Sequence, residues 1–242
     1  MDYIPVVTPF LSESESKGQL IFDGTKIEVP FNVINFEDDE RGYSFTKGEH
    51  WKDCFTNRTD PTGRGINTIV LHWDVCESSE QCFQALCSRQ LSNHLMIDTD
   101  GQVYQPLDIK YKSFHALSFN NRSISIQIAN PVDASKADSE IGRKIITSRQ
   151  PGTNETFEHL DFTFEQKVRV IEVVETLCEL FKRIPRRLPP LDNDGLISNA
   201  QIPDFTGVCA HYNCCGALGP GDSLWPILQE SFRNRPPYAI RF

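Results

Sequence analysis

The sequence has no apolar run approaching the roughly 20 consecutive residues that a membrane-crossing helix needs. Residues 1–16 also lack the basic start and long apolar segment of a standard signal peptide. We therefore expect no membrane span and recognise no export signal, which leaves the location of the protein open. No internal repeat is found.

Positive charge is scarce. The chain carries 24 Lys and Arg against 33 Asp and Glu, a formal net charge of -9. This balance opposes broad attraction to nucleic acid or to an anionic membrane surface, so we expect no nucleic-acid partner. Hydrophobic residues make up 39% and charged residues 24%, with 16 Phe, which is typical of a globular protein. The length of 242 residues fits one large domain or a core domain with an added arm.

The sequence pattern divides the chain at about residue 65. Residues 1–65 mix short apolar runs with turn-rich and charged pieces, and predict an irregular arm with a few strands that packs on a core domain of residues 66–242. The run Asn67–His72 is β-branched and apolar, which predicts a buried strand with His72 at its end. Residues 123–128 alternate polar and apolar side chains, so Gln127 should lie on the polar face of a second strand.

Capping patterns predict the helices. Ser78 with Gln81 predicts a helix over 79–91, Thr163 with Gln166 predicts a longer helix to about Arg183, and Asp222 or Ser223 is expected to cap a last helix that ends near Phe232. Between these helices, 95–104 reads as a hairpin with Gly101 in its turn, and 131–160 as an irregular surface excursion. The expected fold class is α/β.

Six short segments appear in an order that resembles a known family. They are Thr68–Trp73, Ser92–Gln105, Phe114–Ala116, Asn121–Ile128, Ala210–His211 and Gly219–Gly221. Together they resemble the zinc-dependent N-acetylmuramoyl-L-alanine amidases and the peptidoglycan recognition proteins, over roughly residues 66–232. The resemblance implies a central mixed sheet flanked by helices, and a groove that holds a glycan-peptide above a zinc ion.

The resemblance also implies zinc ligands. It places them at His72, at His211 and at a third position that falls on Gly219, which has no side chain to offer. Cys214, Cys215 and Asp222 are nearby substitutes, and we take Cys215 as the candidate while the other two stay open. Three protein ligands would leave one coordination place, where zinc acidifies a water and polarises an amide carbonyl.

Other positions depart from the family pattern. Gln127 stands where many amidases carry a catalytic glutamate, and an amide cannot act as a general base, so it could only orient a water. Asn93 replaces a tyrosine and Ala217 a lysine. Trp73, Asn93 and His115 are the candidate substrate-binding residues, although the sequence favours a core position for Trp73 and leaves groove and core evenly matched for His115. These departures predict weak or absent hydrolysis.

Two functions remain open from the sequence. One is a peptidoglycan- or muropeptide-recognising protein whose inherited reaction is zinc-dependent hydrolysis of the N-acetylmuramoyl-L-alanine amide. The alternative is a catalytically inactive recognition or structural module that docks on a protein partner through its N-terminal arm. Cys76 and Cys82 have the spacing of a small disulfide loop found in many peptidoglycan recognition proteins, but free thiols suit the sequence equally well. His94 is expected to be structural.

Overall fold

A six-stranded mixed sheet forms the centre of the molecule, in the order β12-β5-β9-β6-β7-β3. The computed structural model describes residues 17–48, 53–59, 65–131, 143–150, 152–153, 155–216 and 219–234. The edge strand β12 (Gly207–Ala210) and its neighbours β5 (Thr68–Trp73) and β9 (Ser123–Ile128) run parallel to one another. The predicted α/β class with a mixed sheet is confirmed.

The remaining strands extend the sheet toward the N-terminal segment. β6 (Leu95–Ile97) pairs parallel with β9 and antiparallel with β7 (Val103–Gln105), which confirms the predicted hairpin. Gly101 in its turn has a φ of 80°, a conformation that glycine adopts without steric cost. β3 (Val33–Asn35) then pairs parallel with β7 and forms the outer strand. The N-terminal segment thus contributes to the central sheet itself.

Three small antiparallel pairs surround the sheet. They are β1 (Gly18–Phe22) with β2 (Thr25–Val29), β4 (Phe55–Asn57) with β8 (Tyr111–Ser113), and β10 (Ile145–Arg149) with β11 (Thr156–Leu160). The last pair lies inside the segment 131–160, so the prediction of irregular structure was wrong there. The hairpin hides its pattern because most of its side chains are exposed or half-buried and do not alternate clearly. Residues 132–142 of that segment lie outside the described residues.

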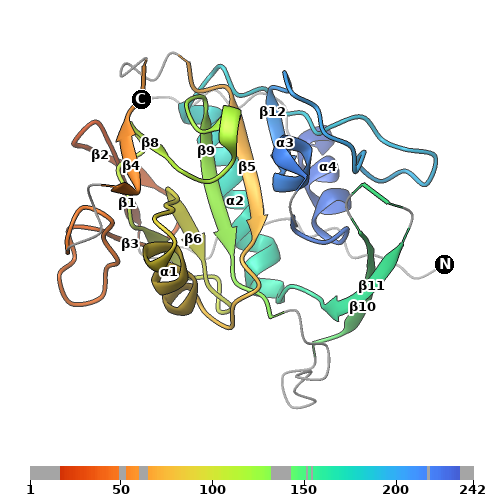
Figure 1. Ribbon diagram of the computed structural model, residues 1–242, viewed down its shortest axis with the longest axis horizontal. Coiled ribbons are helices and arrows are strands. Elements are labelled where there is room, and N and C mark those ends of the chain that lie inside the picture. Colours follow the sequence, from red (N-terminus) through yellow and green to blue (C-terminus); the bar gives the residue numbers. More distant parts are fainter. Residues whose placement is uncertain are drawn as a thin grey trace.

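Helix α2 (Phe164–Leu180) covers one face of the sheet, and α4 (Leu224–Asn234) packs beside it (Figure 1). Isoleucines of β5 and β9 meet the buried valines of α2 in the main hydrophobic core. Burial of this apolar surface is the dominant stabilising term. The Thr163–Gln166 capping box is present as predicted, with both reciprocal hydrogen bonds.

The opposite face of the sheet carries α1 (Ser79–Ser88), the 3₁₀ turn η2 (Leu117–Phe119) and the short helix α3 (His211–Cys215). Val70 of β5 packs there against η2 and α3, and Met96 of β6 packs against α1. Because side chains alternate along a strand, His72 shares this face with Val70. Figure 1 shows α1 and α2 on opposite sides of the sheet. None of the described helices is both long and apolar enough to span a membrane.

Two helix ends differ from expectation. Ser78 caps α1 as predicted, but the helix ends at Ser88, shortly before Gln90 takes a left-handed conformation with a φ of 55°. At α4 neither predicted cap operates. The Asp222 carboxylate binds Arg149 instead, and the Ser223 hydroxyl has no hydrogen-bond partner among the described residues.

Candidate functional site

Two histidines from distant parts of the chain meet at the ends of neighbouring strands. His72 lies near the end of β5, and His211 directly follows β12, whose last residue is paired with Leu71. Their ring centroids are 4.2 Å apart. The convergence expected from the sequence is therefore present, and it follows from the parallel pairing of these two strands.

Two further side chains extend this pair into a row. The Nδ1 atom of His115 lies 2.9 Å from Nε2 of His72, and the thiol of Cys215 lies 2.9 Å from Nε2 of His211. We call the four residues His115, His72, His211 and Cys215 the histidine row. His72 is buried, whereas the other three are half-buried, so the row reaches the surface through its ends.

The hydrogen bonds around His115 assign the tautomers in the row. The Ser123 hydroxyl donates to the carbonyl of Phe119 at 2.7 Å, so its oxygen accepts from Nε2–H of His115 at 2.9 Å. A neutral His115 then carries a lone pair on Nδ1 and accepts from Nε2–H of His72. By this inference Nδ1 of His72 is unprotonated, which is the state that a metal ligand requires.

Burial keeps His72 and His115 neutral. Desolvation lowers the pKa of His72 well below its ordinary value, and repulsion from His211 and His115 lowers it further. Desolvation likewise lowers the pKa of His115, with smaller effects from His94, His211 and Arg58. Both imidazoles are therefore uncharged at neutral pH.

A buried polar layer supports the row from below. His94 is fully buried; its Nδ1 accepts the backbone N–H of Ser125 at 3.1 Å, so its Nε2–H donates to the carbonyl of Tyr111 at 3.0 Å. Desolvation and the nearby Arg58 guanidinium lower the pKa of His94 to about 3. Arg58 itself is buried and donates to the carbonyls of Ile109 and Ser123 at 3.2 and 2.8 Å. These contacts describe a structural role for His94.

Gln127 lies beside His72, because the two residues are paired in register on parallel strands. Paired residues of neighbouring strands point to the same face of a sheet, so the Gln127 side chain is directed toward the side that holds the row. It is only 6% exposed, and its Oε1 atom has no hydrogen-bond partner among the described residues. A buried acceptor left without a partner is costly and suits a position that meets a ligand or a water.

The structure distinguishes the three substitutes for the missing third ligand. The Asp222 carboxylate is held by the Arg149 guanidinium at 3.2 Å. The Cys214 thiol is buried 3.8 Å from that of Cys209 in an apolar cluster. Cys215 alone of the three contacts His211.

Gly219 itself leaves no space for a ligand side chain. A Cβ atom there would lie 2.7 Å from the ring of Tyr212 and 3.0 Å from the Cβ of Ala210. Ala217, where the family pattern has a lysine, lies outside the described residues.

The histidine row fits zinc by the chemistry of its donors. Two imidazoles and a thiolate are common zinc ligands, and the hydrogen bond from Nε2 of His72 to His115 is the outer contact that orients a metal-binding histidine. The side chains of the row contact one another in sequence, His72 with His211 and His211 with Cys215, and do not form a compact group of three ligand atoms. Within the described residues, the compact group of three, with ligand atoms all within 4.8 Å of one another, is Asp74, Cys76 and Cys82.

Two candidate substrate residues do not line the row. Trp73 is 4% exposed, donates its indole N–H to the carbonyl of Asn130 and stacks on Phe157 at 5.6 Å. Asn93 is fully buried, and its amide donates to the carbonyl of Leu95 at 2.7 Å. Both are placed as core residues, whereas His115 belongs to the histidine row.

Sequence reasoning missed the residues that organise the row. The sequence indicates a groove or a buried, hydrogen-bonded position for His115 but not its bond to His72, and it shows Ser123 only as part of an alternating strand. Tertiary contacts of this kind leave no periodic pattern in the chain.

Comparison with known proteins identifies relatives of this chain. A family model described as N-acetylmuramoyl-L-alanine amidase matches residues 62–214. Among solved structures, the chain is similar to the N-acetylmuramoyl-L-alanine amidase LysC from Clostridium intestinale, with 12% identity over 84% of this chain and 99% of that one and a TM-score of 0.49.

Two further solved structures are similar. The Ph2119 endolysin from a Thermus scotoductus bacteriophage has 12% identity over 83% of this chain and 99% of its own, with a TM-score of 0.46. The Drosophila peptidoglycan recognition protein SD has 12% identity over 86% and 97%, with a TM-score of 0.44. A comparison with curated proteins finds no match. The assignment therefore depends on the family model.

Proposed function

The chain belongs to the N-acetylmuramoyl-L-alanine amidase family, and from that premise we propose that it binds zinc and recognises muropeptides, with weak or no hydrolysis of the N-acetylmuramoyl-L-alanine amide. The family is generally zinc-dependent. The observation that carries the proposal is the convergence of His72 and His211, whose rings lie 4.2 Å apart.

We assign the zinc ligands to His72, His211 and Cys215. His72 would bind through Nδ1, because its Nε2–H is occupied by His115. Cys215 is the substitute for the missing third ligand, since its thiol already contacts His211. Zinc, when bound, supplies a Lewis acid that polarises an amide carbonyl and acidifies a water.

The residues around the metal support binding better than catalysis. Gln127 points its unpartnered Oε1 toward the row's side of the sheet, where it can orient a water or an amide N–H of a muropeptide. It cannot accept a proton from water, because an amide is not a base at neutral pH. The proton transfer that hydrolysis requires therefore lacks its usual acceptor. This is why we favour recognition over turnover.

Metal analysis tests the ligand assignment. We expect the purified protein to contain zinc, and the His72→Ala and His211→Ala variants each to lose one equivalent of it. His159→Ala is the matched control, because His159 is also buried but contacts Ser148 and Trp73, away from the histidine row. Zinc content unchanged in both row variants would contradict the assignment.

The substitution Gln127→Glu tests whether the lack of a general base is what limits hydrolysis. A carboxylate beside His72 supplies the missing base, so we expect cleavage of a purified muropeptide to rise by about 10²-fold or more, the range of general base catalysis. Gln127→Met, similar in size but without polar atoms, should show no gain. Strong turnover by the unmodified, zinc-loaded protein would overturn the proposal of weak activity, and failure of the zinc-loaded protein to bind muropeptide in calorimetry would overturn that of recognition.

A further inference from the structure

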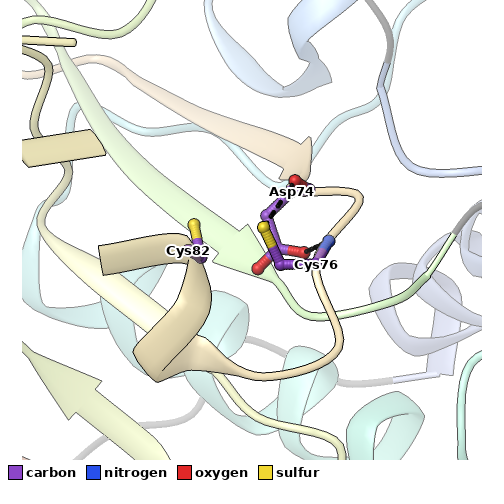
Figure 2. Close-up of side chains that lie close together, drawn as sticks. All are labelled: Asp74, Cys76 and Cys82. Atoms are coloured by element: carbon purple, nitrogen blue, oxygen red, sulfur yellow. Dashed lines mark hydrogen bonds between the residues drawn. The ribbon is translucent and has the colours of Figure 1, made fainter. Parts of the chain in front are cut away.

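A second group of potential metal ligands lies where the loop after β5 meets the start of α1. It consists of Asp74, Cys76 and Cys82, whose ligand atoms all lie within 4.8 Å of one another. Figure 2 shows the three side chains together, with Asp74 and Cys76 on the loop and Cys82 on the first turns of α1. None of them belongs to the histidine row.

The Asp74 carboxylate is oriented by the backbone. Its Oδ1 accepts the N–H groups of Cys76 at 2.9 Å and of Asn130 at 3.3 Å. Its Oδ2 is buried and has no hydrogen-bond partner among the described residues. A buried carboxylate oxygen without a donor is strongly unfavourable in its charged form. A cation at Oδ2 would remove that cost.

The loop brings both thiols to the same place. Val75 has a φ of 58°, which is rare for a β-branched residue and turns the chain back so that the Cys76 thiol lies 3.2 Å from the carbonyl of Asp74. Cys82 is buried, and its thiol lies within 4.8 Å of that of Cys76. Neither cysteine is in a disulfide. An exposed valine held in a strained conformation is explained if the turn serves to assemble a site.

We propose that Asp74, Cys76 and Cys82 bind a thiophilic divalent cation, Zn²⁺, which ties the start of α1 to the end of β5. Two thiolates and one carboxylate are suitable zinc donors, and they leave one place for water. Binding releases the two thiol protons to solvent, so the step involves no oxidant or reductant. The bound cation fixes the loop that directly follows His72 and Trp73.

The test uses the full chain, reduced and stripped of metal, in a His72→Ala/His211→Ala background that removes the first zinc assignment. We expect this variant still to bind one equivalent of Zn²⁺, and Co²⁺ in its place to give a thiolate-to-cobalt absorption band. Adding Cys82→Ser should weaken binding at least 100-fold and abolish the band. Asp74→Asn, which keeps the shape of the side chain, should weaken it at least tenfold.

The control is Cys87→Ser, which removes a thiol from the same helix outside the group and should leave Zn²⁺ affinity and the cobalt band unchanged. Absence of Zn²⁺ binding by the folded, reduced background variant would overturn the proposal. So would a cobalt band that survives Cys82→Ser. A Cys76–Cys82 disulfide, detected by mass spectrometry and persisting under the reducing conditions of the titration, would also overturn it. None of these outcomes bears on the histidine row, which is tested separately by the single variants.

Discussion

His72 is held in a single tautomer by a chain of hydrogen bonds that begins at the Phe119 carbonyl and passes through Ser123 and His115. Replacing Ser123 with alanine removes the hydroxyl that accepts the hydrogen bond from His115, so His115 is free to change tautomer. Because outer contacts of metal-binding histidines typically contribute 10- to 100-fold to affinity, we expect Ser123→Ala to weaken zinc binding at the histidine row by about tenfold or more.

Zinc titration of the variant against a competing chelator measures this effect. Ser125→Ala is the matched control, since Ser125 is on the same strand and face but contacts His94 instead of the row. Equal weakening in the two variants would show that the loss comes from general loosening of the buried layer and not from the tautomer of His72.

Individual residues were predictable only in part. The convergence of His72 and His211 followed from the resemblance to a family, and the facing of Gln127 from strand alternation. The bond between His72 and His115 did not, because the two residues are 43 positions apart and no local pattern connects them. Trp73 was a candidate for the same groove, but side chains alternate along β5, so its ring lies on the other face of the sheet. There it packs against Phe157 and His159, which belong to a strand that the sequence did not predict.

Among the elements, the segment that leads into α4 decides whether a ligand side chain could stand at Gly219, where the family pattern places one. Gly219 packs so closely on Tyr212 and Ala210 that a Cβ would lie 2.7 Å from the tyrosine ring. We expect Gly219→Asp to lower the free energy of unfolding by about 1–3 kcal/mol, as overpacking does, without raising zinc affinity. Urea unfolding and zinc titration measure the two effects.

Gly195→Asp provides the comparison for that variant. A Cβ at Gly195 meets nothing within 4 Å, and aspartate tolerates its φ of 77° better than most residues, so a smaller loss of stability is expected. A gain in zinc affinity at Gly219→Asp would show that Tyr212 moves aside, and that the segment is more adaptable than its packing indicates.

Elements with strong local signals were predicted well. The Thr163–Gln166 capping box and the apolar stripe of α2 are contained within the helix itself, and the hairpin of β6 and β7 has its glycine in the turn. The start of α4 was not predicted correctly, because Asp222 is taken by an ion pair with Arg149, 73 residues away. Partners so distant in sequence compete with local capping in ways that a pattern does not reveal.

The whole molecule should lose stability in mild acid because several histidines are buried uncharged. The pKa of His94 is lowered to about 3, and those of His72 and His115 are also lowered, whereas an unfolded histidine titrates near 6.5. Below pH 6.5 the unfolded chain therefore binds protons that the folded protein does not. Stability is fully present above that pH and falls as the pH decreases through it.

For His94 alone this linkage lowers the free energy of unfolding by about 2 kcal/mol between pH 7.5 and pH 5. Urea unfolding of metal-free protein at the two pH values measures it. His94→Gln, which has no group titrating in this range, should show a smaller difference between the two pH values. An unfolding free energy that is the same at pH 5 and pH 7.5 would contradict the buried, neutral state of these rings.

The position of strand β3 limits where the chain can be truncated at its N-terminal side. The family match begins at residue 62, yet the outer rim of the central sheet is made by Val33–Asn35, which precede it. A recombinant fragment that begins at residue 62 would lack β3 and leave the backbone amides of β7 unpaired. Unpaired edge strands tend to pair with other copies of the chain, which leads to aggregation. Precipitation of such a fragment would then reflect the missing strand β3 and not an inability of the remaining residues to fold.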